Sequence, residues 1–299
     1  MTRSSCWSRI VPAFAVAWLL LVASSPIRAA DAPPPRSRSE VEAILRLAPK
    51  STDSRPLKVL LVAGPKDHGP GEHDYPKWQQ EWAPLLRKAP QVEVVTAFPW
   101  PTPEQWEGAD LAVFYLKTRW DAAQLVHVRR HQERGGGIVT IHWAIGCDQD
   151  WEKHAGHFGL SYRSASYRHG AVNLKLTLPD HPVALGLPAT IPFVDEPYWP
   201  FIGDPTRVRV LATSDEQIYR GDDRRQNPGD PTVQTVPVFW TYEPAGTTAR
   251  VFVSIFGHYM WTFDDPLFRL LLLRGMAWSA KADPYRWDAL AVEGVKLAD

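Results

Sequence analysis

Residues 68–75, HGPGEHDY, place two histidines and a glutamate among glycines shortly after the apolar run VLLVA. Imidazole and carboxylate groups can transfer protons near neutral pH or bind a divalent metal ion. Glycines let the backbone approach a ligand closely. We therefore expect His68, Glu72 and His73 to form a pocket wall, although a simple turn between a strand and a helix could contain the same residues.

Polar side chains also follow three other apolar runs of the strand type. These are Lys117 and Arg119 after residues 110–116, His142 and Trp143 after residues 137–141, and His258 at the end of residues 249–257. Ligands of open parallel sheets bind outside the carboxyl ends of the strands. We expect these side chains to share one cleft with the HGPGEHDY loop, although each histidine alone could be a hydrogen-bonded structural residue.

The apolar runs alternate with helical patterns in the first half of the chain. Strands are predicted at 57–63, 92–98, 110–116 and 137–143, and helices at 75–89 and 122–135. This alternation favours parallel pairing with right-handed crossovers. The second half is richer in strands, with runs at 171–178, 208–214, 236–242 and 249–257, before a helix at 265–280. The prediction is one α/β domain over residues 57–280, a mainly parallel sheet with helices on both faces and β-rich insertions covering one side.

The two ends of the chain differ from this domain. Residues 1–30 carry arginines, then a short apolar run, then small residues, the order typical of a signal peptide. We expect export to the periplasm or the medium, with an uncleaved anchor as the alternative. Residues 31–56 are predicted to be a Pro/Ser-rich linker with one short helix at 40–47, and residues 281–299 a C-terminal tail.

Charge and cysteine content narrow the function classes. The chain has 33 basic and 33 acidic residues, and residues 1–30 hold three arginines and no acid, so the mature charge is 30 − 33 = −3. Without a basic stripe, neither a nucleic-acid partner nor, after signal cleavage, a membrane partner is expected. Cys6 lies in the signal segment, which leaves Cys147 without an intrachain disulfide partner.

Other candidate residues have less specific patterns. His127 and His131 fall in the predicted helix at 122–135 and are expected to be solvated or capping residues. His154 and His157 are three apart and could bind a metal from one helix face. Cys147 could be a nucleophile, but the position directly after the strand, where such a residue would sit, is held by His142.

Several motifs occur in the order of a known family. HGPGEHDY, GGGIVTIH (135–142), DEPYW (195–199), PVFWTYE (237–243) and RVFVSIFGHYMWTFDDPLFRLLLLRGMAW (250–278) resemble the ThuA-like (trehalose-utilisation) family over about residues 57–280. The resemblance implies a flavodoxin-like fold of the class I glutamine amidotransferase-like superfamily. True amidotransferases carry a catalytic cysteine at the strand-to-helix elbow, where this chain has His142. The resemblance therefore argues against glutamine hydrolysis.

The resemblance also implies a carbohydrate as the small-molecule partner. The family is linked to trehalose and related disaccharides, so we expect a lyase or hydrolase acting on a disaccharide-derived or 3-keto sugar. His73, His142 and His258 are the expected acid–base or metal-binding set, with a divalent metal as one option. Substrate binding is assigned to His68, Glu72, Arg119, Trp143, Glu196 and Trp240. The alternatives are a non-catalytic carbohydrate-binding or scaffold domain and, more weakly, a hydrolase that uses Cys147.

Overall fold

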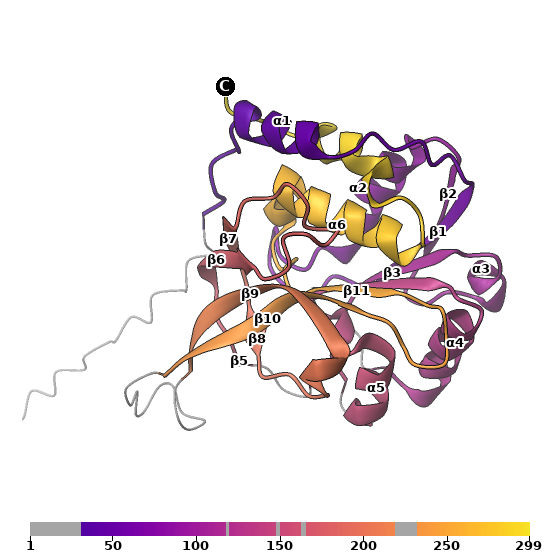
Figure 1. Cartoon of the computed structure of the whole chain (residues 1–299). Coiled ribbons are helices and arrows are strands. Elements are labelled where there is room, and N and C mark those ends of the chain that lie inside the picture. The colour runs from indigo at the N-terminus through magenta and orange to yellow at the C-terminus, as the bar shows by residue number, and fades with distance from the viewer. Residues whose placement is uncertain (1–30, 118–119, 148–149, 163–165, 219–231) are drawn as a thin grey trace, which may run out of the picture. The chain divides into compact units, whose positions relative to one another are not determined.

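The computed structural model describes residues 31–117, 120–147, 150–162, 166–218 and 232–299 (Figure 1). Residues 32–299 form one compact unit. The predicted signal peptide and Arg119 lie outside the described residues, so export stays a prediction. Within the described residues, no helix has both the length and the apolar character needed to cross a membrane.

Five strands form the parallel half of the sheet. They are β1 (Leu57–Ala63), β2 (Val92–Ala97), β3 (Leu111–Tyr115), β4 (Gly137–Ile141) and β11 (Val251–Ser254). Their spatial order is β2-β1-β3-β4-β11, and each neighbouring pair is parallel. β1, β3, β4 and β11 are buried almost throughout, as their apolar sequences predict. This is the flavodoxin-like order, and the fold class predicted from the sequence is confirmed.

The β-rich second half continues the same sheet instead of covering it. β10 (Thr232–Tyr242), β9 (Val208–Ile218), β6 (Gly170–Leu176) and β7 (Thr190–Asp195) follow β11 in that order, all antiparallel. Because each of the four neighbouring pairs from β11 to β7 is antiparallel, β7 runs in the same direction as β11. The short strands β5 (Ser166–Tyr167) and β8 (Tyr198–Trp199) pair separately. β7 was not predicted because Pro192 interrupts its pattern, but proline is tolerated in an edge strand.

Helices cover both faces of the sheet (Figure 1). α1 (Arg38–Leu47), α2 (Tyr75–Arg87) and α6 (Pro266–Ser279) lie on one face, and α4 (Ala122–Glu133) and α5 (Trp151–Phe158) on the other. A short α3 (Pro103–Trp106) precedes β3. The 3₁₀ segments are η1 (His142–Ile145), η2 (Pro205–Arg207), η3 (Met260–Asp264) and η4 (Pro284–Val292). Aspartate side chains cap the amino ends of α2, α4 and α6.

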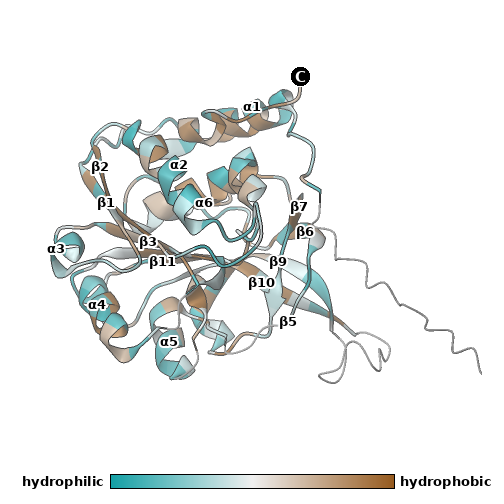
Figure 2. Cartoon of the chain, turned by 180° about the vertical axis from the view of Figure 1, so that it is seen from behind, coloured by the Kyte–Doolittle hydropathy of each residue, from teal (hydrophilic) through white to brown (hydrophobic). Residues whose placement is uncertain are grey.

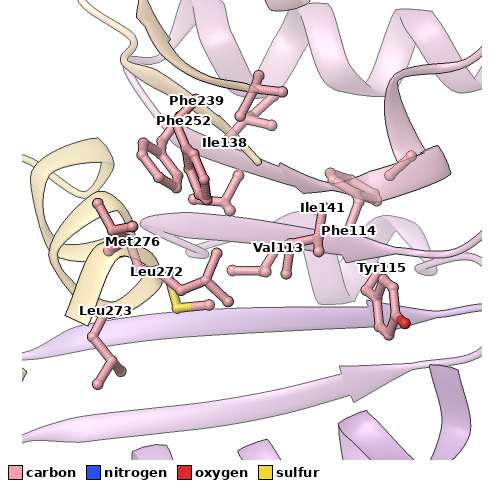
Figure 3. Close-up of a cluster of buried hydrophobic side chains, with 14 of the residues drawn as sticks. Val113, Phe114, Tyr115, Ile138, Ile141, Phe239, Phe252, Leu272, Leu273 and Met276 are labelled. Atoms are coloured by element: carbon pink, nitrogen blue, oxygen red, sulfur yellow. The ribbon is translucent and has the colours of Figure 1, made fainter. Parts of the chain in front are cut away.

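The main core lies between α6 and the parallel strands. Figure 3 shows Leu272 and Met276 of α6 facing Ile138 of β4 and Val113 of β3. A methyl group added to Gly275 would meet the Phe252 ring at 2.4 Å, so glycine allows the close approach of helix and sheet. Figure 2 shows apolar residues along the central strands and polar residues on the outer sides of α4 and α5.

Segments outside residues 57–280 belong to the same compact unit. Val41 and Ile44 of α1 are buried, and Ser37 forms a β-bridge with Ala298. Trp287 of η4 is 1% exposed. The unit therefore extends beyond the predicted domain at both ends, because short amphipathic helices there have apolar faces to bury.

Candidate active site at the carboxyl ends of the strands

Four buried side chains meet where strands of the sheet end. His73 comes from the loop after β1, His142 directly follows β4, Glu196 directly follows β7, and His258 follows β11. One possible ligand atom from each side chain lies within 4.8 Å of all the others. We call these four residues the His/Glu cluster. Glu196 reaches it because β7 runs in the direction of β11.

The backbone is unusual at two members of the cluster. His73 has φ of 42° and His142 has φ of 56°, in the left-handed region that side chains other than glycine rarely adopt. His142 is the first residue after β4, so a sharp turn directs its side chain out of the strand end. Such backbone strain is often concentrated at functional sites, where the surrounding structure holds it.

Hydrogen bonds fix the tautomers of two histidines. His73 Nδ1 lies 2.9 Å from Asp67 Oδ1, and His142 Nδ1 lies 2.7 Å from the backbone oxygen of Ile255. These oxygens accept, so both Nδ1 atoms carry the proton. In the neutral rings the Nε2 atoms then hold lone pairs, and they face each other at 2.9 Å. His142 Nε2 is also 3.1 Å from Glu196 Oε2.

His258 completes the cluster from the opposite side. Its Nδ1 lies 3.0 Å from Glu196 Oε2 and its Nε2 lies 3.8 Å from Glu72 Oε1. The first distance is short, but the geometry is not that of a hydrogen bond, and neither ring nitrogen has a hydrogen-bond partner among the described residues. The carboxylate of Asp195 accepts from the backbone N–H groups of Gly257 and His258, which holds this loop in place.

The charges of the site follow from these contacts. Burial alone would raise the pKa of Glu196, but the close approach of the His142 and His258 imidazoles holds it well below the usual value. Burial would also raise the pKa of Asp67, yet bonds from His73, His68 and Lys117 lower it. Burial lowers the pKa of His73 to about 3 despite the opposing bond to Asp67. The site therefore holds two carboxylates beside a neutral His73.

A cavity of about 210 Å³ lies over the His/Glu cluster. Its lining residues are His68, Lys117, Trp143, Tyr167, His169, Glu196 and Tyr198. Glu196 belongs to both the cavity and the cluster. Larger hollows of about 610 and 560 Å³ lie near the amino ends of β1 and β11, at the edge of the sheet opposite the one where ligands of such folds bind.

Two groups of contacting polar side chains lie at the cavity wall. Asp67 Oδ1 lies 3.0 Å from His68 Nδ1, and Asp67 Oδ2 lies 3.0 Å from Lys117 Nζ, which sits 5.3 Å from the centre of the Trp143 ring. His169 Nε2 lies 3.3 Å from Glu196 Oε1. The His68 side chain is 33% exposed and that of His169 is 34% exposed, so both imidazoles can meet a ligand.

The predicted site residues fall into three groups. His68, Trp143 and Glu196 line the cavity, whereas His73, His142 and His258 meet one another beneath it and do not line it. Glu72 lies beside His258. The assignment of Trp240 to substrate binding was wrong: it is fully buried, and its indole N–H donates to the backbone oxygen of Phe158. Sequence reasoning missed Asp67, Tyr167, His169 and Tyr198, and it noted Lys117 without selecting it.

The remaining candidate residues lie outside the site and have structural roles. His131 was expected to be a solvated or capping residue, but this residue of α4 is 2% exposed. His157 bonds to Gln132, and His154 is buried against the Phe158 ring, so the two do not act as a pair. Cys147 is 3% exposed, with its Sγ 3.4 Å from Ser161 Oγ, which does not fit an exposed nucleophile beside a histidine.

Comparison with known proteins identifies the family. A family model described as ThuA, trehalose utilisation, matches residues 59–279. A ThuA-like protein from Parabacteroides merdae ATCC 43184 is 21% identical, with a TM-score of 0.55 over 76% of this chain and 90% of that one. Another from Bacteroides uniformis ATCC 8492 is 18% identical, with a TM-score of 0.57 over 79% of this chain and 98% of that one. No protein with a curated description matches.

These structural matches show a shared fold, which agrees with the flavodoxin-like order of the parallel strands described above. The family model covers most of the chain. The protein therefore belongs to the ThuA, trehalose-utilisation, family.

Proposed function

We propose that the protein is an exported enzyme that acts on a 3-keto sugar derived from a disaccharide, and that it does not hydrolyse glutamine. Membership of the trehalose-utilisation family supports a role with carbohydrates. The observation that carries the proposal is the Asp67–His68 pair, which lies beside Lys117 in the wall of the cavity. This arrangement offers a base and a cation to one bound molecule.

His68 is the proposed general base. Because its Nδ1–H donates to Asp67, its Nε2 is left with a lone pair that can take a proton. A carboxylate that orients a histidine in this way is the usual arrangement for base catalysis. In a 3-keto sugar the hydrogen on C2 is acidic because it is next to the carbonyl group. His68 is therefore suited to remove it.

Lys117 is the proposed partner of the sugar carbonyl oxygen. Proton removal from C2 places negative charge on that oxygen, and an ammonium group nearby stabilises the charge. The enolate electrons then re-form the C3 carbonyl, the C1=C2 double bond forms, and the C1–O bond breaks. The departing alkoxide takes a proton, so the products are an unsaturated keto sugar and an alcohol. This is an elimination, and added water would complete a net hydrolysis.

The cavity suits one sugar ring. At about 210 Å³ it is smaller than the ~300–1,000 Å³ of pockets for larger ligands, so the second unit of a disaccharide would remain outside. Trp143 offers an aromatic face for ring stacking. Glu196 and His169 can bind hydroxyl groups. The buried His73 shares the Asp67 carboxylate with His68 and so helps to position the base.

Proton exchange on a 3-keto glucoside in D₂O, followed by NMR, tests the proposal. The full chain should exchange the C2 proton and release the alcohol, whereas glutamine should remain unchanged. In His68→Gln both rates should fall at least ~100-fold, the contribution typical of a general base. The control is His127→Gln on α4, which should behave as the parent protein does.

Two outcomes would contradict this assignment. Binding of the sugar without exchange would favour the alternative, a non-catalytic carbohydrate-binding domain. Glutaminase activity would instead assign the function of a glutamine amidotransferase to the chain. Export is tested separately by the intact mass of the native protein, which should begin near residues 29–32. A mature chain that retains Met1 or Thr2 would exclude cleavage of the predicted signal peptide.

A further inference from the structure

We infer that the His/Glu cluster is a binding site for one divalent first-row transition metal ion. Its ligands are His73 Nε2, His142 Nε2, a ring nitrogen of His258 and a carboxylate oxygen of Glu196. All four residues are buried, and the atoms lie within 4.8 Å of one another. Bonds of about 2.0–2.2 Å to a central zinc ion hold ligand atoms at most about 4.4 Å apart, so the four side chains would close slightly around the ion.

The first argument is the convergence of lone pairs. The Nδ1 protons of His73 and His142 are committed to oxygen acceptors, so their two Nε2 atoms face each other at 2.9 Å as acceptors. Glu196 Oε2 is a third acceptor, 3.1 Å from His142 Nε2. Buried acceptors that face one another without a donor are unfavourable, because each has lost its bonds to water. A cation at their centre removes this cost.

A proton does not satisfy the cluster as well as a metal ion. One proton on His142 Nε2 can point at His73 or at Glu196, and His258 still has both ring nitrogens without a hydrogen-bond partner among the described residues. A metal ion accepts all four electron pairs at once. The approach of His258 Nδ1 to within 3.0 Å of Glu196, without hydrogen-bond geometry, fits two ligands aimed at a common point.

The second argument is the outer shell of the cluster. Metal-binding histidines usually donate their other N–H to a carboxylate or a backbone carbonyl, as His73 does to Asp67 and His142 does to Ile255. Asp195 holds the backbone of the His258 loop through the N–H groups of Gly257 and His258. The Glu196 carboxylate is flanked by His169 on its other oxygen. Three ligand side chains thus have a second contact, and the fourth, His258, is held through its backbone.

The ligand set indicates the type of ion. Three imidazoles with one carboxylate favour zinc, iron, cobalt, nickel or copper over magnesium or calcium, which prefer oxygen. Glu196 is the ligand that also lines the cavity, so a sugar oxygen would approach the ion from that side. There the ion would polarise a carbonyl or hydroxyl group. This catalytic role rests on the proposed function, whereas metal binding does not.

The test uses the full chain, stripped with a chelator and titrated with Zn²⁺ by calorimetry and with Co²⁺ by visible absorption. We expect one ion per chain and a Co²⁺ spectrum typical of nitrogen and oxygen ligands. Glu196→Gln should weaken Zn²⁺ binding at least ~100-fold, since even outer-shell changes cost 10–100-fold. Glu133→Gln is the control, because Glu133 is an exposed carboxylate on α4 that pairs with Arg129 and contacts no member of the cluster, and this variant should bind as the parent does.

The results separate this inference from the proposed function. One Zn²⁺ per chain that depends on Glu196 supports the site, even if 3-keto sugars are not processed. The inference is overturned if neither Zn²⁺ nor Co²⁺ binds stoichiometrically. It is also overturned if the two glutamine variants bind Zn²⁺ equally well. Circular dichroism establishes whether each variant is folded. If a variant does not fold, the Co²⁺ spectrum of the unaltered chain still tests the type of ligand. Full sugar turnover by the stripped protein would overturn the catalytic role of the metal.

Discussion

Two of the regions that contain buried histidines have opposite hydrogen bonding. In the last turn of α4, His131 Nε2 donates to the backbone oxygen of Gly137 at 2.9 Å, and its Nδ1 accepts from Arg134 at 2.8 Å. Both ring nitrogens are satisfied. At the strand ends, the Nε2 atoms of His73 and His142 face each other as acceptors. Burial alone therefore does not mark a functional histidine, whereas incomplete hydrogen bonding at a strand end does.

The difference extends to the surrounding backbone. A methyl group added to Gly136 would meet the His131 ring at 2.3 Å, so the chain is shaped tightly around this imidazole. His73 and His142 have left-handed backbones instead, a conformation that costs free energy. The structure around His131 serves stability, and the structure around the cluster holds side chains in positions that do not favour stability by themselves.

The largest expected effect comes from Glu196→Gln. The variant removes a metal ligand and a cavity carboxylate, so we expect turnover of a 3-keto sugar to fall at least ~1,000-fold. The amide can still donate to the lone pair of His142, so the free energy of unfolding of the metal-free chain should change by less than about 1 kcal/mol. Kinetics and urea unfolding of the same preparation check both statements. Retained turnover would remove Glu196 from the site.

The opposite result is expected for His131→Leu. The substitution leaves the Gly137 oxygen and an Arg134 N–H group without their buried partner, so the free energy of unfolding near pH 7.5 should fall by roughly 2–4 kcal/mol. Zn²⁺ stoichiometry should be unchanged. Urea unfolding and metal analysis measure the two effects. A loss of metal without a loss of stability would reverse the roles given to the two regions.

The stability difference between the parent protein and His131→Leu should also depend on pH. Burial lowers the pKa of His131 in the folded chain to about 4, with Arg134 adding to the shift, whereas the ordinary value is 6.5. Between these values the unfolded chain binds more protons, so the stability contributed by His131 is present above pH 6.5 and is lost as the pH falls towards 4. The full shift corresponds to about 3 kcal/mol. His131→Leu should therefore be much less destabilising at pH 4.5 than at pH 7.5. An equal cost at both pH values would mean that His131 is not held neutral.

Cys147→Ala should have the smallest effect. The thiol is buried next to Ser161, which places Cys147 with His131 as a structural residue. Its loss should lower the free energy of unfolding by about 1 kcal/mol, typical of a small buried truncation, and leave sugar turnover and Zn²⁺ binding unchanged. An assay of the variant with sugar and with glutamine decides the matter, because a glutaminase that disappears in Cys147→Ala would make the cysteine catalytic.

The sequence predicted the parallel half of the site well. Continuous apolar runs mark strands buried on both faces, and polar residues directly after them must meet at one edge of a parallel sheet. This logic found His73, His142 and His258. Which of them would line a cavity could not be predicted, because it depends on how far each loop folds back over the strand ends.

Apart from Asp67, the residues that were missed come from the part of the chain between β4 and β11. His169 precedes β6, and β6 runs against the parallel strands, so its beginning lies where their ends lie. A search limited to residues that directly follow predicted strands cannot find His169, because it precedes its strand. Trp240 shows the converse: it lies within β10, where an alternating side chain can face the core, and its aromatic character gave no sign of the direction. The many charged residues of its helix favour a solvated or capping role for His131, whereas the structure buries it.

The antiparallel strands come from one continuous part of the chain, between β4 and β11. This division makes the protein modular: the parallel sheet supplies the imidazoles of the cluster, and the β6–β7 hairpin supplies the carboxylate of Glu196 together with His169. Exchange of that hairpin between relatives would alter the acidic ligand and the hydroxyl-binding wall while leaving the imidazoles in place. New substrate preferences could thus arise by replacing one hairpin on an unchanged sheet.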